Sequence, residues 1–224
     1  MKKLSSAILL AAMLGLGLCM AGTVLAAPAK TADQTLDEAW TAYNIGQYNK
    51  VVQMVQPLAS EGNPRAQVLL ARCYENGLGV AQDMDTAAKW FRIAAEQNYP
   101  EAQVQLAYLY ELGAGVPKND ATVADLMGRA ATAGNAEAQF NIALYFSQGR
   151  YGLAKNPEQS FAWAKRSADQ GFAQAQRYVG ACYEFGVGVG QNVSEAAVWY
   201  GKAAAQGLEK EGSVFNSERV YTMP

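Results

Sequence analysis

Three stretches of the chain resemble one another closely: AQVLLARCYENGLGV at residues 66–80, AQVQLAYLYELGAGV at 102–116 and AQRYVGACYEFGVGV at 175–189. A fourth, AQFNIALYFSQGRYGL at 138–153, shares their start and departs after its first glycine. If the alanine that opens each stretch is taken as a marker, successive markers lie 36, 36 and 37 residues apart, and a glycine follows each marker by eleven residues. Repetition at such a period predicts one supersecondary unit stacked on the next.

Each unit predicts two helices. Apolar and small residues fall four, five and eight residues after the marker, which places them on one helical face, as in Ala66, Leu70, Ala71 and Tyr74. The following glycine predicts a left-handed helix end. The predicted N-caps of the second helices are Asp83, Asn119, Asn156 and Asn192, and their predicted ends are Asn98, Gly134, Gly171 and Gly207.

The organisation expected from this pattern is an export signal, a helix stack and a tail. Its segments are a signal peptide at 1–26, a linker at 27–33, a divergent N-terminal helix pair at 34–65, repeats at 66–101, 102–137, 138–174 and 175–210, and a C-terminal tail at 211–224. The tail is expected either to cap the last helix pair or to bind a partner, because a terminal repeat otherwise leaves an apolar face in water.

Taken together, the marker alanines, the Gly-x-Gly-Val loops and segments such as AKWFRIAA at 88–95 and VWYGKAA at 198–204 closely resemble the Sel1-like repeat family, which is TPR-like. The second unit departs from the pattern at Leu126-Met127-Gly128, and the third departs at Arg150-Tyr151-Gly152-Leu153. The resemblance implies an all-α fold, a right-handed α/α superhelix (solenoid) of helix hairpins. It also implies a protein-interaction scaffold of the exported bacterial type.

The first residues predict a secretory signal peptide. Lys2 and Lys3 precede an apolar run from Ala7 to Ala21, and small residues then place signal-peptidase cleavage after Ala26. The expected location is therefore periplasmic or secreted. A retained membrane anchor and lipidation at Cys19 are the two alternatives, and the export signal is the only membrane association expected.

Composition narrows the chemistry. The chain has 224 residues, no histidine, and 18 basic against 20 acidic residues, for a net charge of -2. The lack of histidine excludes Ser-His-Asp and Cys-His nucleophile systems and most zinc sites, and the lack of a cationic excess disfavours nucleic acid as a partner. We expect no catalytic residues, no metal and no small-molecule cofactor. The Gly-x-Gly loops lack the preceding strand and the third glycine of a nucleotide-binding motif.

Two cysteines occupy the same repeat position, seven residues after the marker. Cys73 belongs to the first unit and Cys182 to the fourth, so stacking holds them too far apart for a disulfide. We expect both to be buried small hydrophobes, with no disulfide in the protein.

A partner is expected on the concave side of the stack, on the positions two, six, nine and ten residues after each marker. The predicted partner-binding residues are Tyr108, Leu112, Phe140, Leu144, Phe185, Arg72 and Arg177. Aromatic and arginine side chains are frequent interface anchors. Alternatively, Val104, Phe140 and Leu144 pack on the neighbouring helix. Glu75, Glu111 and Glu184 recur nine residues after the marker and predict a solvated surface rather than a catalytic acid pair.

The function predicted is a non-catalytic scaffold or adaptor in the bacterial cell envelope that binds an envelope protein or peptide segment. A hydrolase is the alternative of another class, since cysteine-rich Sel1-like proteins are described as β-lactamase-like. This chain has neither a Ser-x-x-Lys tetrad nor a Lys-Thr-Gly motif, nor a cysteine pair within one repeat. A purely structural envelope component is the third possibility.

Overall fold

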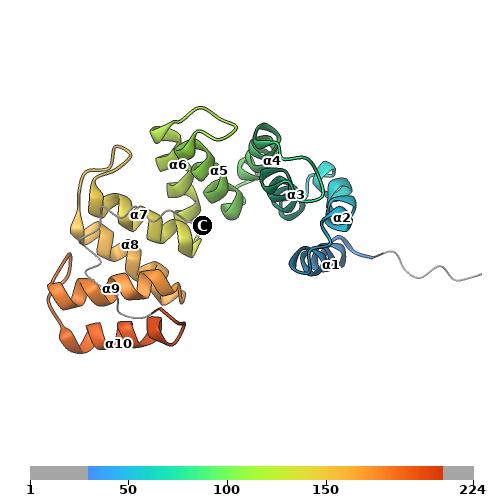
Figure 1. Ribbon diagram of the computed structural model, residues 1–224. Helices are drawn as coiled ribbons and strands as arrows, with labels where there is room; N and C mark the ends of the chain where they lie inside the picture. Colours follow the sequence, from blue (N-terminus) through green and yellow to red (C-terminus); the bar gives the residue numbers. More distant parts are fainter. Residues whose placement is uncertain (1–29, 209–224) are drawn as a thin grey trace, which may run out of the picture. The chain divides into compact units, whose positions relative to one another are not determined.

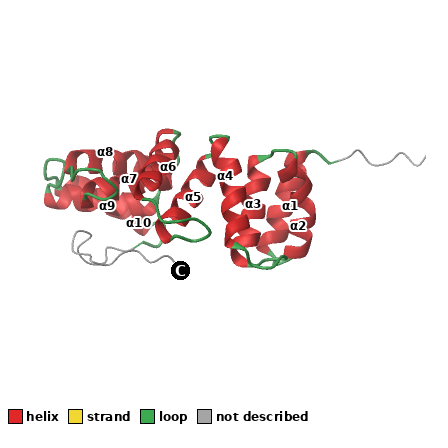
Figure 2. Cartoon of the chain, turned by 90° about the horizontal axis from the view of Figure 1, so that it is seen from above, coloured by secondary structure: helices red, strands yellow, loops and turns green. Residues whose placement is uncertain are grey.

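The computed structural model of the protein describes residues 30–208, and in that range it contains ten α-helices and no strand (Figure 1; Figure 2). All ten belong to the compact unit that begins at Thr31. The helices are α1 (Ala32–Asn44), α2 (Tyr48–Ser60), α3 (Pro64–Asn76), α4 (Met84–Glu96), α5 (Pro100–Leu112), α6 (Asp120–Thr132), α7 (Ala136–Gln148), α8 (Pro157–Asp169), α9 (Ala173–Phe185) and α10 (Val193–Ala204). The predicted all-α class is confirmed.

The helix ends follow the local chemistry that the sequence predicted. Asp83, Asn119, Asn156 and Asn192 each accept a hydrogen bond from the backbone N–H three residues later, at the start of α4, α6, α8 and α10. First helices end on left-handed glycines, and the residues that follow the second helices, Asn98, Gly134, Gly171 and Gly207, also have positive φ. Each end therefore satisfies orphan backbone groups without tertiary help.

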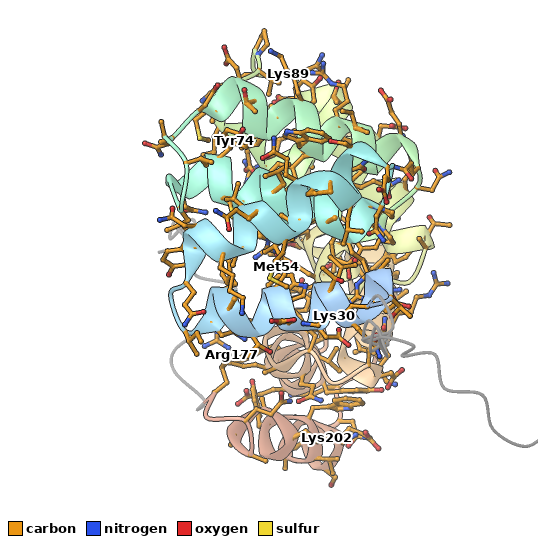
Figure 3. The ribbon with its side chains drawn as sticks, turned by 90° about the vertical axis from the view of Figure 1, so that its right-hand side faces the viewer. Lys30, Met54, Tyr74, Lys89, Arg177 and Lys202 are labelled. Atoms are coloured by element: carbon orange, nitrogen blue, oxygen red, sulfur yellow. The ribbon has the colours of Figure 1, made fainter. Side chains whose placement is uncertain are left out.

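The core runs along the stack as three adjoining clusters. The predicted small positions are buried in every repeat: Ala66, Ala102, Ala138 and Ala175 are all fully covered. The large rings eight residues after the markers are half-buried, because they lie in the last turn of their helices. Tyr74, labelled in Figure 3, packs against both the cluster formed by α1 to α3 and the cluster formed by α3 to α7, so it joins them.

The second glycine of each Gly-x-Gly loop packs on the preceding repeat. A Cβ at Gly115 would lie 2.2 Å from the carbonyl oxygen of Met84, in the first turn of α4, and Gly79 and Gly188 approach Tyr48 and Pro157 in the same way. The sequence had predicted only a conformational role for these glycines. Their second role is steric, because no side chain fits between the loop and the helix beneath it.

The loop of the third repeat packs on its neighbours through side chains. Tyr151 stands where the other loops have the second glycine, and it has a φ of 52°. Its hydroxyl donates a hydrogen bond to Glu111, and its ring centroid lies 4.5 Å from the ring centroid of Tyr145. This loop is therefore held by side-chain contacts to α5 and α7 in place of a close backbone approach.

Three predictions lie outside the described residues: the signal peptide with its cleavage site, lipidation at Cys19, and the role of the tail at 211–224. Among the residues that the structure does describe, no helix is long and apolar enough to cross a membrane.

Candidate partner-binding surface

The predicted partner-binding residues all lie on the first helices of the repeats, α3, α5, α7 and α9, and the row two residues after the marker is mostly covered. Val104 is 1% exposed, and Val68 and Phe140 are also buried. Phe140 packs against Phe172 and Tyr178, with ring centroids 5.7 and 5.9 Å apart. The prediction that this row faces outward is wrong for these three residues. A helix inside a stack has neighbours on both sides, so a wide arc of its surface is buried.

Tyr108 connects two repeats. Its half-buried hydroxyl donates to Glu137 Oε1 at 2.8 Å and accepts from Asn141 Nδ2 at 2.8 Å, and both partners are on α7. Burial and the neighbouring Glu137 carboxylate raise the pKa of Tyr108, so it remains a neutral donor. Leu144 is partly buried against the cluster formed by α7 to α10. Both side chains thus serve contacts between helices, and their part in partner binding stays a prediction.

The two arginines lie half-buried near opposite ends of the repeat array. Burial raises the pKa of Glu75, and the Arg72 charge opposes that rise. Arg177 on α9, labelled in Figure 3, has a similar effect on Tyr200, whose pKa is raised by burial and by Glu184 and lowered by the arginine. Arg72 therefore lies near the recurring glutamate of its repeat, Glu75, and Arg177 lies near Tyr200, whose hydroxyl donates to the recurring glutamate Glu184.

Those glutamates do not form the solvated surface that was predicted. All three are half-buried. Glu111 accepts hydrogen bonds from Tyr151 and, at 3.2 Å, from Arg150 Nη2, while Glu184 Oε2 accepts from Tyr200 at 2.7 Å. They lie in the last turn of each first helix, where the loop of the following repeat contacts Glu111 and the second helix of the same repeat contacts Glu184.

Two predicted residues are well exposed. Leu112 is 68% exposed and Phe185 is 56% exposed, and each is the last residue of its helix, directly before the terminating glycine. The other two members of this row, Asn76 and Gln148, are exposed as well. This row, Asn76, Leu112, Gln148 and Phe185, is called the helix-end row below. Its two apolar side chains lie outside the core, so covering them would not disturb it.

The sequence pattern predicted no role for the glutamine that follows each marker alanine. Each of these side chains is at least 94% buried and hydrogen-bonded to the preceding helix: Gln67, Gln103, Gln139 and Gln176. Their strict recurrence beside a buried alanine was the available signal, because a polar residue on a buried face needs partners.

The thiols of Cys73 and Cys182 are buried and free. Burial raises the pKa of Cys73 to about 11 and that of Cys182 to about 12. Within residues 30–208, no three His, Cys, Asp or Glu side chains gather closely enough to hold a metal ion.

Comparison with known proteins agrees with this geometry. The Sel1 repeat pattern matches residues 64–99, 100–135, 136–172 and 173–208, so that each match covers one first helix, one glycine loop and one second helix. The chain belongs to the Sel1 repeat family. Proteins of the Sel1 repeat family are typically protein-interaction scaffolds and generally not catalysts.

Solved Sel1 repeat structures share the fold. The chain is similar to a Sel1 repeat protein from Oxalobacter formigenes, with 34% identity and a TM-score of 0.69, covering 71% of this chain and 46% of the other. It is also similar to c5321, a protective antigen with an SLR fold from uropathogenic Escherichia coli, with 29% identity, a TM-score of 0.69, and 79% and 38% coverage. The α-solenoid fold is thereby confirmed.

A curated relative is the chitin synthase regulatory factor 3 of Schizosaccharomyces pombe. It is 30% identical over 160 residues, which are 70% of this chain and 13% of the relative. The chain therefore spans about an eighth of that protein and less than half of either Sel1 repeat structure.

Proposed function

We propose that this Sel1 repeat protein is a non-catalytic scaffold of the bacterial cell envelope that binds a protein or peptide segment along its helix-end row. The observation that carries the proposal is the exposure of Leu112 and Phe185 at one repeat position. In scaffolds of stacked repeats, a partner commonly contacts equivalent positions of successive units, because each unit repeats the same geometry.

Physical chemistry favours these two side chains as anchors. Each is a large apolar group exposed beside a loop, and covering it removes apolar surface from water without rearranging the core. Arg72 lies on the same helix as Asn76 and Arg177 on the same helix as Phe185, and we expect the two arginines to orient the bound segment. The family's typical role as a scaffold supports this reading, as does the name of the fungal relative, which is that of a regulatory factor.

The envelope location rests on the sequence. Lys2 and Lys3, the apolar run that follows and the small residues before Ala27 support export and cleavage after Ala26. Immunoblotting of fractionated cells tests this part. A shortened, periplasmic or secreted product is expected, and an unshortened protein in the cytoplasmic fraction would overturn it.

Affinity capture tests the binding surface. The full chain and its Leu112→Ser/Phe185→Ser variant are immobilised and incubated with a detergent extract of the envelope, and captured proteins are identified by mass spectrometry. A control variant, Ile45→Ser/Ile93→Ser, removes two aliphatic side chains that are also exposed but lie on α1's end and α4. We expect a protein retained by the chain and the control and reduced by at least tenfold on the helix-end variant. Equal retention by all three would refute the helix-end row.

A further inference from the structure

Each repeat buries one glutamine side chain that connects it to the helix before it. The Nε2 atoms of Gln67, Gln103, Gln139 and Gln176 donate to the carbonyl oxygens of Ala59, Ala95, Ala131 and Ala168, at 3.1, 3.3, 3.1 and 3.3 Å. These bonds use the donor side of each carboxamide. The Oε1 atom then remains as a buried acceptor that needs a donor of its own.

Three repeats supply that donor from a second glutamine just after their second helix. The Nε2 atoms of Gln97, Gln170 and Gln206 donate to Oε1 of Gln67, Gln139 and Gln176, at 2.8, 2.7 and 2.9 Å. The second repeat has Ala133 at this position. As a result, Gln103 Oε1 is buried and has no hydrogen-bond partner.

A pocket lies where the missing side chain would be. It has a volume of about 560 Å³, and its walls include Gln103, Gly128, Arg129 and Ala133. Gly128 stands where the first and third repeats have Arg92 and Lys165, so two truncations open this space together. The pocket is thus a gap in a pattern that the neighbouring repeats complete with their own residues.

The polar groups around the pocket select the chemistry of an occupant. Arg129 Nη2 donates to Asn98 Oδ1 at 3.0 Å and to the Ala95 carbonyl at 3.3 Å, and Nη1 lies 3.7 Å from Asp125. Asp125 also lines the pocket and offsets the charge of this guanidinium, so the wall as a whole favours a neutral guest. The unpaired group is an acceptor, so the guest must donate. A neutral carboxamide meets both conditions, and it is the group that fills the equivalent place in three repeats.

We propose that this pocket binds the side chain of a glutamine from a partner polypeptide, whose Nε2 donates to Gln103 Oε1 in place of the missing residue at 133. The proposal deepens the proposed function and rests on it, because it names a feature of the bound segment. The partner completes the glutamine pairing that the second repeat lacks, and the site lies at the joint between repeats rather than on the helix-end row.

The test uses three short peptides and NMR of the ¹⁵N-labelled full chain. The peptides are acetyl-Gly-Gln-Gly-amide, its Met counterpart of similar length with no side-chain donor, and its Glu counterpart with an acceptor only. We expect the Gln peptide alone to shift the Gln103 side-chain amide and the backbone signals of Gly128 and Ala133. Equal shifts from the Met or Glu peptide, or none from the Gln peptide at millimolar concentration, would overturn the proposal.

Two variants that fill the pocket give an independent readout. Ala133→Gln restores the side chain of the other repeats, and Gly128→Lys restores that of the third. Both are expected to abolish the Gln-peptide response while keeping the helical circular-dichroism spectrum. An undiminished response in both would place the peptide elsewhere and refute the site.

Affinity capture separates this proposal from the broader one. If the Ala133→Gln variant retains a partner as fully as the wild-type chain does, the glutamine pocket is refuted while the scaffold function stands. If retention falls at least fivefold on Ala133→Gln and on Leu112→Ser/Phe185→Ser, both are supported.

Discussion

Replacing Gly115 by alanine tests whether the glycine loops hold successive repeats together by close backbone approach. The added Cβ would lie 2.2 Å from the Met84 carbonyl oxygen and 2.9 Å from the Asp85 nitrogen. Ordinary contact begins at 3.4 Å, so the loop or the first turn of α4 must move by more than an ångström. Both obstacles are backbone atoms of a capped helix, which cannot rotate away as a side chain does.

Gly134→Ala provides the matched control. Gly134 also has positive φ, but a Cβ there would meet nothing within 4 Å. Both substitutions replace glycine by alanine, so their effects on the unfolded chain cancel. The positive φ costs each variant about 1–2 kcal/mol, and overpacking adds about 1–3 kcal/mol at Gly115 alone. We therefore expect Gly115→Ala to lower the free energy of unfolding by about 2–5 kcal/mol, and the control to lower it by about 1–2 kcal/mol.

Urea unfolding followed by circular dichroism at the helical band measures the difference. Hydrogen exchange locates it, because the first turn of α4 is expected to lose protection in Gly115→Ala only. Equal unfolding midpoints for the two variants would refute the reasoning, since the contact with Met84 would then have no energetic consequence.

The remaining predictions concern buried polar groups and thiols. Ala133→Gln is expected to raise the free energy of unfolding by about 1 kcal/mol, because the new side chain donates to Gln103 Oε1. Ala133→Met adds a side chain of similar length without a donor and is expected to leave that free energy unchanged. Equal gains for both variants in urea unfolding would contradict the pairing. Tyr108→Phe is expected to lower the free energy of unfolding by about 1–2 kcal/mol, because the half-buried polar groups of Glu137 and Asn141 lose their partner. The Tyr110 hydroxyl accepts only an exposed hydrogen bond from Arg92, so Tyr110→Phe is expected to lower it by less than about 0.5 kcal/mol. With Cys19 replaced by serine, the native chain at pH 8 is expected to react with a thiol reagent only as fast as it unfolds, and the denatured chain is expected to show two thiols. Since burial raises the pKa of Cys73 to about 11 and of Cys182 to about 12, their contribution to stability is complete below the unfolded pKa of about 8.5 and is lost as the pH rises through 11 to 12. Rapid labelling of both thiols in the native chain would contradict that burial.

Much of the fold was predictable because it is decided by local chemistry. The caps at Asp83 and Asn156, the left-handed end at Gly113 and the buried face that includes Ala102 each depend on residues within one or two helical turns. Their recurrence at a fixed spacing then indicates stacking, since a single hairpin cannot bury its own apolar face. The family and the all-α architecture followed from the same residues.

The candidate site was predicted less well, because it depends on contacts between repeats. The sequence placed Leu112 and Phe185 at one exposed position, and the structure agrees. It could not distinguish them from Tyr108, whose hydroxyl is engaged by Glu137, 29 residues later, or from Phe140, which packs under Phe172. Helical periodicity gives the direction of a side chain, but a neighbouring repeat decides whether that direction leads to water.

By itself, then, the sequence determined the N-caps of the second helices, the glycine ends of the first helices, the apolar face of each repeat, and that the units stack. Only the tertiary structure showed that Gly115 touches Met84, that Gln103 lacks the donor which Gln97, Gln170 and Gln206 supply elsewhere, and that a pocket opens beside Ala133. The physical reason is the separation along the chain over which each interaction acts. Caps and periodicity act within a few residues along the chain, whereas steric fit and hydrogen-bond satisfaction depend on atoms about 30 residues apart, brought together only when one repeat packs on the next.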